Sequence, residues 1–141
     1  MKPNANFRRD IIPFWINALS ILVILILALK SISAYFYPGL AYANFDASTL
    51  ANQKAMMELA GRNVVMLLLT IAALRSQNAM FLTYSFLMHL IRELQDMLIV
   101  PYYVGFTSVQ GIGIFFVFLF VFVIPYLFAL KKLRTLAALP D

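Results

Sequence analysis

Four ionisable residues near the middle of the chain have the spacing of one face of an α-helix. His89, Arg92, Glu93 and Asp96 follow the pattern i, i+3, i+4 and i+7, and Ser85 extends it by one turn. In this register His89 can meet Glu93, and Arg92 can meet Asp96. Such a face could transfer protons, because histidine changes its charge near neutral pH. It could also hold the polar head of a ligand or contact a second helix.

His89 is the only histidine of the chain, and two further roles are open to it. A lone histidine in a membrane protein can ligate a haem or a chlorophyll. Against this role, Glu93 and Ser85 offer hydrogen-bonding partners about one helical turn away. We therefore expect a structural hydrogen bond at His89. Zinc and copper sites need several His or Cys ligands, and the chain has no cysteine, so we expect no metal site and no required cofactor.

A second group of charged residues accompanies this face. Glu58 and Arg62 are also spaced i, i+4, and Lys30 lies near the end of an earlier apolar segment. Together with the charges of the first face, they form a neutral set of three cations and three anions. A neutral set suits a region of low dielectric, because an unpaired buried charge is strongly unfavourable. We expect these charges to form one polar site that binds a ligand or holds helices together. Its residues are Lys30, Glu58, Arg62, His89, Arg92, Glu93 and Asp96.

The simplest alternative is that these charges only hold helices together. Polar contacts between membrane helices contribute about 0.6–2 kcal/mol each. Six charged groups exceed what such adhesion needs, and ionisable residues inside membrane segments usually mark function. Three interpretations therefore stay open: adhesion between helices, a ligand-binding or proton-handling site, and contact with a partner subunit.

The composition places these residues in an integral membrane protein. Of the 141 residues, 63% are hydrophobic and only 12% are charged, whereas soluble domains are about half apolar and about a quarter charged. This balance excludes a water-soluble globule, a disordered tail and a nucleic-acid-binding module. Basic residues gather at the chain ends, as is typical of the cytoplasmic flanks of membrane helices: Lys2, Arg8, Arg9, Lys131, Lys132 and Arg134.

The apolar segments predict an all-α fold, namely a polytopic membrane protein built as a four-helix transmembrane bundle. A helix needs about 20 predominantly apolar residues to cross a bilayer. The chain is short enough for a single transmembrane domain, residues 1–141. We expect spans at about residues 11–35, 55–74, 79–100 and 112–130, and an outer loop at about residues 38–54.

Capping residues and prolines mark the expected ends of these spans. The helix of the second span is expected to begin near Ser48 or Ala55, and Asp46 or Ser48 suits its N-cap. Pro101 is expected to end the third span. Pro125 lies inside the fourth span, where it should kink the helix or loosen its last turns, because it has no backbone N–H.

The distribution of basic residues predicts the orientation. Four spans put both chain ends on one side, together with Arg75 in a short turn, and leave only Lys54 in the opposite loops. Basic residues favour the cytoplasmic side. We therefore expect both termini in the cytoplasm of a bacterium, the protein in its inner membrane, and the charged polar site in the outer half of the bilayer.

Two short motifs resemble those of a known family. Gly61-Arg62-Asn63 opens one apolar helix, and Arg92-Glu93-Leu94-Gln95-Asp96 closes another. In these motifs residues 55–100 resemble the DoxX-like family of small four-helix bacterial membrane proteins, although Asn63 stands where an acid is common there. The resemblance implies an interhelical pair between Arg62 and Asp96. It also implies a relation to membrane subunits of quinone-linked oxidoreductases.

These features favour an accessory or structural subunit of a larger membrane complex, of a redox or quinone-linked kind, over an enzyme acting alone. The sequence has no nucleophilic triad, phosphate-binding glycine loop or supported carboxylate pair. The alternative is a stand-alone DoxX-like protein that binds a quinone, a lipid or a similar amphiphile in the outer half of the bundle. A proton-coupled transporter has the least support. Expected partners are membrane lipids, and other membrane subunits or further copies of this chain.

Overall fold

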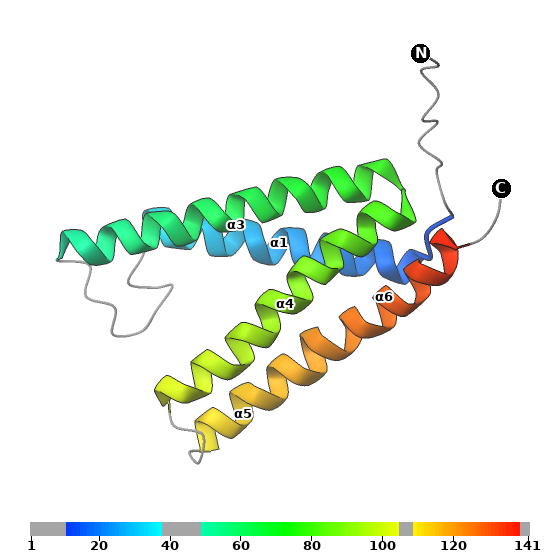
Figure 1. Ribbon diagram of the computed structural model, residues 1–141. Helices are drawn as coiled ribbons and strands as arrows, with labels where there is room; N and C mark the ends of the chain where they lie inside the picture. The colour runs from blue at the N-terminus through cyan, green and yellow to red at the C-terminus, as the bar shows by residue number, and fades with distance from the viewer. Residues whose placement is uncertain (1–10, 38–48, 105–108, 139–141) are drawn as a thin grey trace. The chain divides into compact units, whose positions relative to one another are not determined.

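The described part of the chain is helical throughout. The computed structural model describes residues 11–37, 49–104 and 109–138, and every regular element in these ranges is a helix (Figure 1). The expected all-α class is therefore confirmed. In chain order the elements are α1 (Phe14–Phe36), α3 (Leu50–Ser76), α4 (Ala79–Val104), α5 (Val109–Val117), the π-helix η1 (Phe118–Val123) and α6 (Ile124–Ala137).

Three helical segments are long and apolar enough to cross a membrane, namely Phe14–Phe36, Leu50–Ser76 and Gly111–Ala137. A helix rises about 1.5 Å per residue, so the 23 residues of α1 exceed the roughly 30 Å of a hydrocarbon core. These lengths and compositions are those of an integral membrane protein. The 26 residues of α4 are long enough for one more crossing, but three charged residues, Arg92, Glu93 and Asp96, lie close together within this helix.

Hydroxyl side chains within these helices bond back to their own backbone. Ser20 donates to the Ile16 carbonyl at 2.9 Å, and Ser31 donates to the Leu27 carbonyl at 2.8 Å. Both serines are buried. A hydroxyl without a partner is costly in hydrocarbon, and an i−4 carbonyl satisfies it without leaving the helix. The serines of α1 are therefore compatible with an apolar surrounding.

The chain divides into two compact units, of which residues 13–75 form one and hold α1 and α3. In this unit Ala34 of α1 packs with Met56 and Ala60 of α3. A Cβ atom added at Gly61 would lie 3.9 Å from the Tyr35 hydroxyl oxygen. Small side chains at this contact let the two helices approach closely, as is common between membrane helices.

The N-terminus of α3 lies between the two expected starts, Ser48 and Ala55. The helix begins at Leu50, so residues 50–54, which the sequence places in the outer loop, are helical. Thr49 acts as the cap, because its hydroxyl oxygen accepts the backbone N–H of Asn52 at 3.3 Å. The two expected caps, Asp46 and Ser48, lie outside the described residues. Polarity does not mark a loop here, because polar residues such as Gln53 and Lys54 have good helix propensity.

A tight turn joins α3 to α4. Gln77 has a φ of 49°, in the left-handed region that non-glycine residues rarely adopt. Asn78 then caps α4, since its side-chain oxygen accepts the backbone N–H of Phe81 at 2.9 Å. Its own backbone N–H donates to the Ser76 hydroxyl at 3.2 Å. These bonds satisfy backbone groups that a helix end would otherwise leave without partners.

The second unit is built on the pairing of α4 with the α5–η1–α6 segment, which lies antiparallel beside it (Figure 1). Leu82 and Phe86 of α4, and Tyr126 and Leu133 of α6, are buried. The rings of Phe86 and Tyr126 lie 5.6 Å apart between centroids, at 55°. Tilted aromatic pairs of this kind add about 0.5–1.5 kcal/mol beyond the burial of their area.

The prolines of this unit act differently from what their positions predict. Pro101 does not end the helix, because α4 continues to Val104. Before Pro125 the chain forms the π-helix η1, after which the Ile124 N–H bonds to the Leu119 carbonyl. A proline ring crowds the carbonyl four residues earlier, and a wider π turn relieves this crowding. The expected disturbance is therefore present, but it precedes Pro125 instead of loosening the last turns.

Asn78→Ala should lower the thermal stability of the protein. The substitution removes the acceptor of the Phe81 N–H, and the loss of an N-cap costs about 1 kcal/mol. Circular dichroism in a mild detergent measures the unfolding midpoint. Asn78→Asp keeps an acceptor oxygen at the cap and should unfold near the wild-type midpoint. Equal midpoints for Asn78→Ala and the wild type would contradict the capping role.

Candidate functional site

Two of the predicted site residues are almost completely buried. His89 and Glu93, one turn apart on α4, are each 1% exposed. Ser85, one turn before His89, is buried as well. Residues at i and i+4 share a helix face, so burial follows the face that the residue spacing predicts.

Tyr126 of α6 faces this part of α4. It is 1% exposed, and its ring centroid lies 6.1 Å from that of His89. The phenol also interacts electrostatically with Glu93 and Arg92. We refer to His89, Arg92, Glu93 and Tyr126 as the polar cluster. It combines an imidazole, a guanidinium, a carboxylate and a phenol on two packed helices.

Arg92 and Glu93 form a salt bridge at the centre of the polar cluster. The Nη2 atom of Arg92 donates to the Oε1 atom of Glu93. The Arg92 side chain is 19% exposed, whereas that of Glu93 is only 1% exposed. Side chains at i and i+1 do not face each other on a helix. The long arginine side chain must therefore bend around the helix to reach the buried carboxylate.

This salt bridge leaves other polar atoms of the two residues unsatisfied. Within the described ranges, Nε and Nη1 of Arg92 and Oε2 of Glu93 are buried and have no hydrogen-bond partner. Each such atom costs about 1–3 kcal/mol, and more where the group is charged. A further acceptor near Arg92 and a further donor near Glu93 would remove this cost. The polar cluster therefore keeps two donor nitrogens of Arg92 and one acceptor oxygen of Glu93 that could bond a further polar group.

Asp96 does not take the place that the spacing predicts. It is only half-buried, and among the described residues the guanidinium of Arg92 contacts Glu93 instead. The salt bridge of Arg92 thus goes to Glu93, and a pair between Arg92 and Asp96 stays a prediction. The physical reason is that a charge pair is attracted more strongly where water is excluded, and Glu93 is the more buried carboxylate.

The remaining predicted site residues belong to the other unit. Lys30 of α1, and Glu58 and Arg62 of α3, are exposed there. Arg62 and Asp96 lie in different units, so the pair that the family resemblance implies stays a prediction. The same holds for the neutral set of six charges as a single site.

Tyr126 is the member of the polar cluster that residue spacing does not point to. Its only signal is a hydroxyl-bearing ring next to Pro125, in a segment otherwise rich in Phe, Leu and Val. Which residue of α6 meets His89 depends on the register between two helices. No local pattern determines that register.

The polar cluster can hold a polar group by hydrogen bonds or pass a proton between His89, Glu93 and Tyr126. Its groups are of the kinds that act as general acids and bases. Among the described residues, no group of three or more His, Cys, Asp or Glu side chains is placed to hold a metal ion. Ligation of a haem or a chlorophyll by His89 stays a prediction.

Comparison of the chain with protein-family models, with curated proteins and with solved structures finds no match.

Glu93→Gln should destabilise the protein strongly. It leaves the Arg92 charge without its counter-charge, and breaking a buried ion pair from one side costs about 3–5 kcal/mol. Unfolding by increasing dodecyl sulfate in a mild detergent measures the free energy of unfolding. Removing both charges, with Arg92→Met and Glu93→Gln together, should recover most of the loss.

Asp96→Asn is the matched control for Glu93→Gln. It makes the same chemical change one turn along α4, at a carboxylate that Arg92 does not contact. We expect a change within about 0.5 kcal/mol. A loss at Asp96→Asn as large as that at Glu93→Gln would show that Asp96 is the true partner of Arg92.

Proposed function

We propose that this chain is a small integral membrane protein with four transmembrane helices that serves as an accessory subunit of a larger membrane complex. The observation that supports this most is the exposed charge on its helices. Glu58 and Arg62 are exposed on α3, a segment apolar enough to cross a membrane. A charged side chain exposed on a membrane-crossing helix is unfavourable, by about 2.5–3.5 kcal/mol or more at the centre of the bilayer. A neighbouring subunit with opposite charges removes this cost.

The polar cluster supports the same proposal. Arg92 and Glu93 retain buried polar atoms that have no partner within the described residues. Buried polar groups in folded proteins are almost always hydrogen-bonded. A complex would complete these bonds through polar side chains of a second subunit. In the proposed topology α4 is the third of four crossings, and the neutral Arg92–Glu93 pair makes that crossing less costly.

The proposed complex is redox or quinone-linked, and the proposed location is the inner membrane of a bacterium. The first point rests on the resemblance of residues 55–100 to DoxX-like proteins. The second rests on the basic residues at both chain ends, which favour cytoplasmic termini. In this role the chain has no catalytic activity of its own.

A second candidate function is the binding of a quinone or a similar amphiphile. The observation that favours it is the chemistry of the unsatisfied atoms. A guanidinium donates to a quinone carbonyl, and a carboxylate accepts from the hydroxyl of the reduced form. Arg92 and Glu93 offer both groups side by side, and the phenylalanines of η1 could cover an apolar tail. Proton-coupled transport through His89 and Glu93 is the weakest of the three candidates.

Extraction from the native membrane should separate these functions. We expect native mass spectrometry in a mild detergent to show the chain in a heavy assembly of fixed stoichiometry. A free monomer or homo-oligomer without other subunits would overturn the accessory role. If such a species carries a reproducible small adduct, the amphiphile-binding function takes its place. An absorbance spectrum of the same sample tests for a haem or pigment at His89.

Glu58→Lys should release the chain from this assembly. The substitution reverses an exposed charge within a membrane-crossing helix, and like charges across an interface cost several kcal/mol. Copurification of partner subunits measures the effect, and circular dichroism checks that the helices remain folded. Lys54→Glu reverses a charge in the first turn of the same helix and should leave copurification unchanged. Equal release by both variants would contradict a specific role of Glu58.

A further inference from the structure

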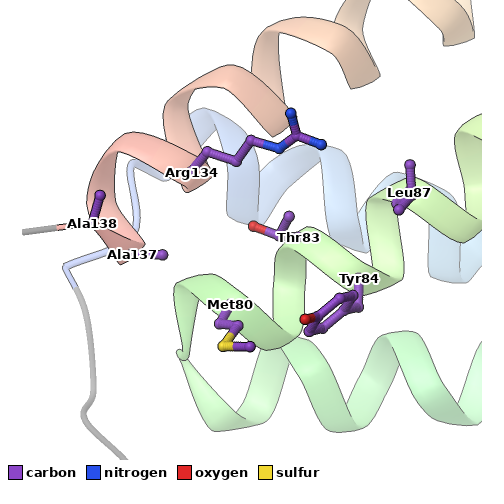
Figure 2. Close-up of a pocket in the computed structure, with 7 residues that line it drawn as sticks. All are labelled: Met80, Thr83, Tyr84, Leu87, Arg134, Ala137 and Ala138. Atoms are coloured by element: carbon purple, nitrogen blue, oxygen red, sulfur yellow. The ribbon is translucent and has the colours of Figure 1, made fainter.

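A cavity lies where the first turns of α4 meet the last turns of α6. Its volume is about 390 Å³, within the range of small-molecule sites (Figure 2). We name it the basic-end cavity, because it lies at the end of α6 that carries lysine and arginine residues. It is lined by Met80, Thr83, Tyr84, Leu87, Arg134, Ala137 and Ala138.

Arg134 provides the charge of the basic-end cavity. Figure 2 shows its side chain extending from α6 toward the side where Thr83 and Leu87 of α4 lie. None of the described residues that line the cavity is acidic. Along α4 the first carboxylate is Glu93, which Arg92 already engages. The guanidinium of Arg134 is therefore a cation without a nearby counter-charge on the cavity wall.

A second cation lies one turn away on the same helix. Lys131 precedes Arg134 by three residues, so the two side chains are neighbours on the surface of α6. Lys131 ends a groove of about 370 Å³ whose other lining residues are Ile124, Leu127 and Phe128. The groove lies along the first half of α6, so an apolar surface that leads to a cation occurs twice along this helix.

The polar groups of the basic-end cavity are mainly donors. Tyr84 is 53% exposed, and its phenol can donate a hydrogen bond. The hydroxyl of Thr83 is different, because it already donates to the Ala79 carbonyl at 2.7 Å. The positive end of the α4 dipole lies near the negative end of the α6 dipole, because Ala137 and Ala138 also line the cavity, so the net positive charge comes from Arg134. The cavity therefore suits an anion, while Met80 and Leu87 give it apolar walls.

We propose that the basic-end cavity binds the phosphate headgroup of an anionic phospholipid, with Arg134 as the main donor. A guanidinium pairs with two phosphate oxygens at once, and Met80 and Leu87 contact the adjoining hydrocarbon. The apolar walls beside the cation fit a lipid better than free phosphate, which has no apolar part. In the proposed orientation this end faces the cytoplasmic leaflet, which carries anionic lipids. The inference requires membrane insertion, as in the proposed function, but no partner subunit.

Lipid retention by the purified full-length protein tests this site. Native mass spectrometry compares phosphatidylglycerol with phosphatidylcholine at equal concentrations in detergent. We expect the wild type to retain phosphatidylglycerol preferentially. Arg134→Gln should weaken this retention roughly tenfold, because a charge-assisted hydrogen bond is lost. Arg134→Lys should keep part of it, since a lysine retains the charge but not the paired donors.

Lys132→Gln is the matched control, because it removes a charge from the same helix at an exposed residue that lines neither space. It should retain phosphatidylglycerol like the wild type. Equal losses in Lys132→Gln and Arg134→Gln, or equal retention of both lipids by the wild type, would overturn the site. Displacement of phosphatidylglycerol by excess inorganic phosphate would overturn the lipid as its ligand. Because partner subunits are absent from this experiment, its failure is distinct from failure of the accessory role.

Discussion

A carboxylate buried between apolar helices must have a cation within reach, and for Glu93 this cation is Arg92, the residue that precedes it in the chain. Arg92 has to bend around α4 to make this salt bridge, and it does so with one of its nitrogens. The pair is neutral as a whole, which makes a charged helix compatible with an apolar surrounding. The salt bridge stabilises the buried carboxylate. Within the described residues, it leaves two donors of Arg92 and one acceptor of Glu93 without hydrogen-bond partners.

The rest of the second unit is arranged around this constraint. Phe86 and Tyr126 close the space beside His89 with large rings, so that little of the imidazole or the carboxylate is exposed. The π-helix η1 precedes α6 and shifts the angular position of every residue that follows it. Such a shift helps to determine which side chain of α6 faces α4. A local irregularity caused by Pro125 thereby contributes to the position of Tyr126.

The α4–α6 pair has two electrostatic environments along its length. Near its middle the charges cancel, and burial protects them from water. Around Arg134 and Lys131, none of the described residues that line the cavity or the groove carries a carboxylate. The first environment suits a neutral or hydrogen-bonding partner within the bilayer. The second suits an anion at the membrane surface, where water and headgroups solvate the charges.

The sequence by itself determined the class of this protein and the face of α4 that is buried. Composition and apolar segment length depend only on residue type, and the i, i+4 spacing of His89 and Glu93 depends only on helix geometry. The tertiary structure decided which carboxylate Arg92 contacts, because that choice depends on burial and not on spacing. It also decided that Tyr126 joins the polar cluster and that Arg134 meets the first turns of α4. Both follow from the register between two helices, which no local pattern of residues specifies.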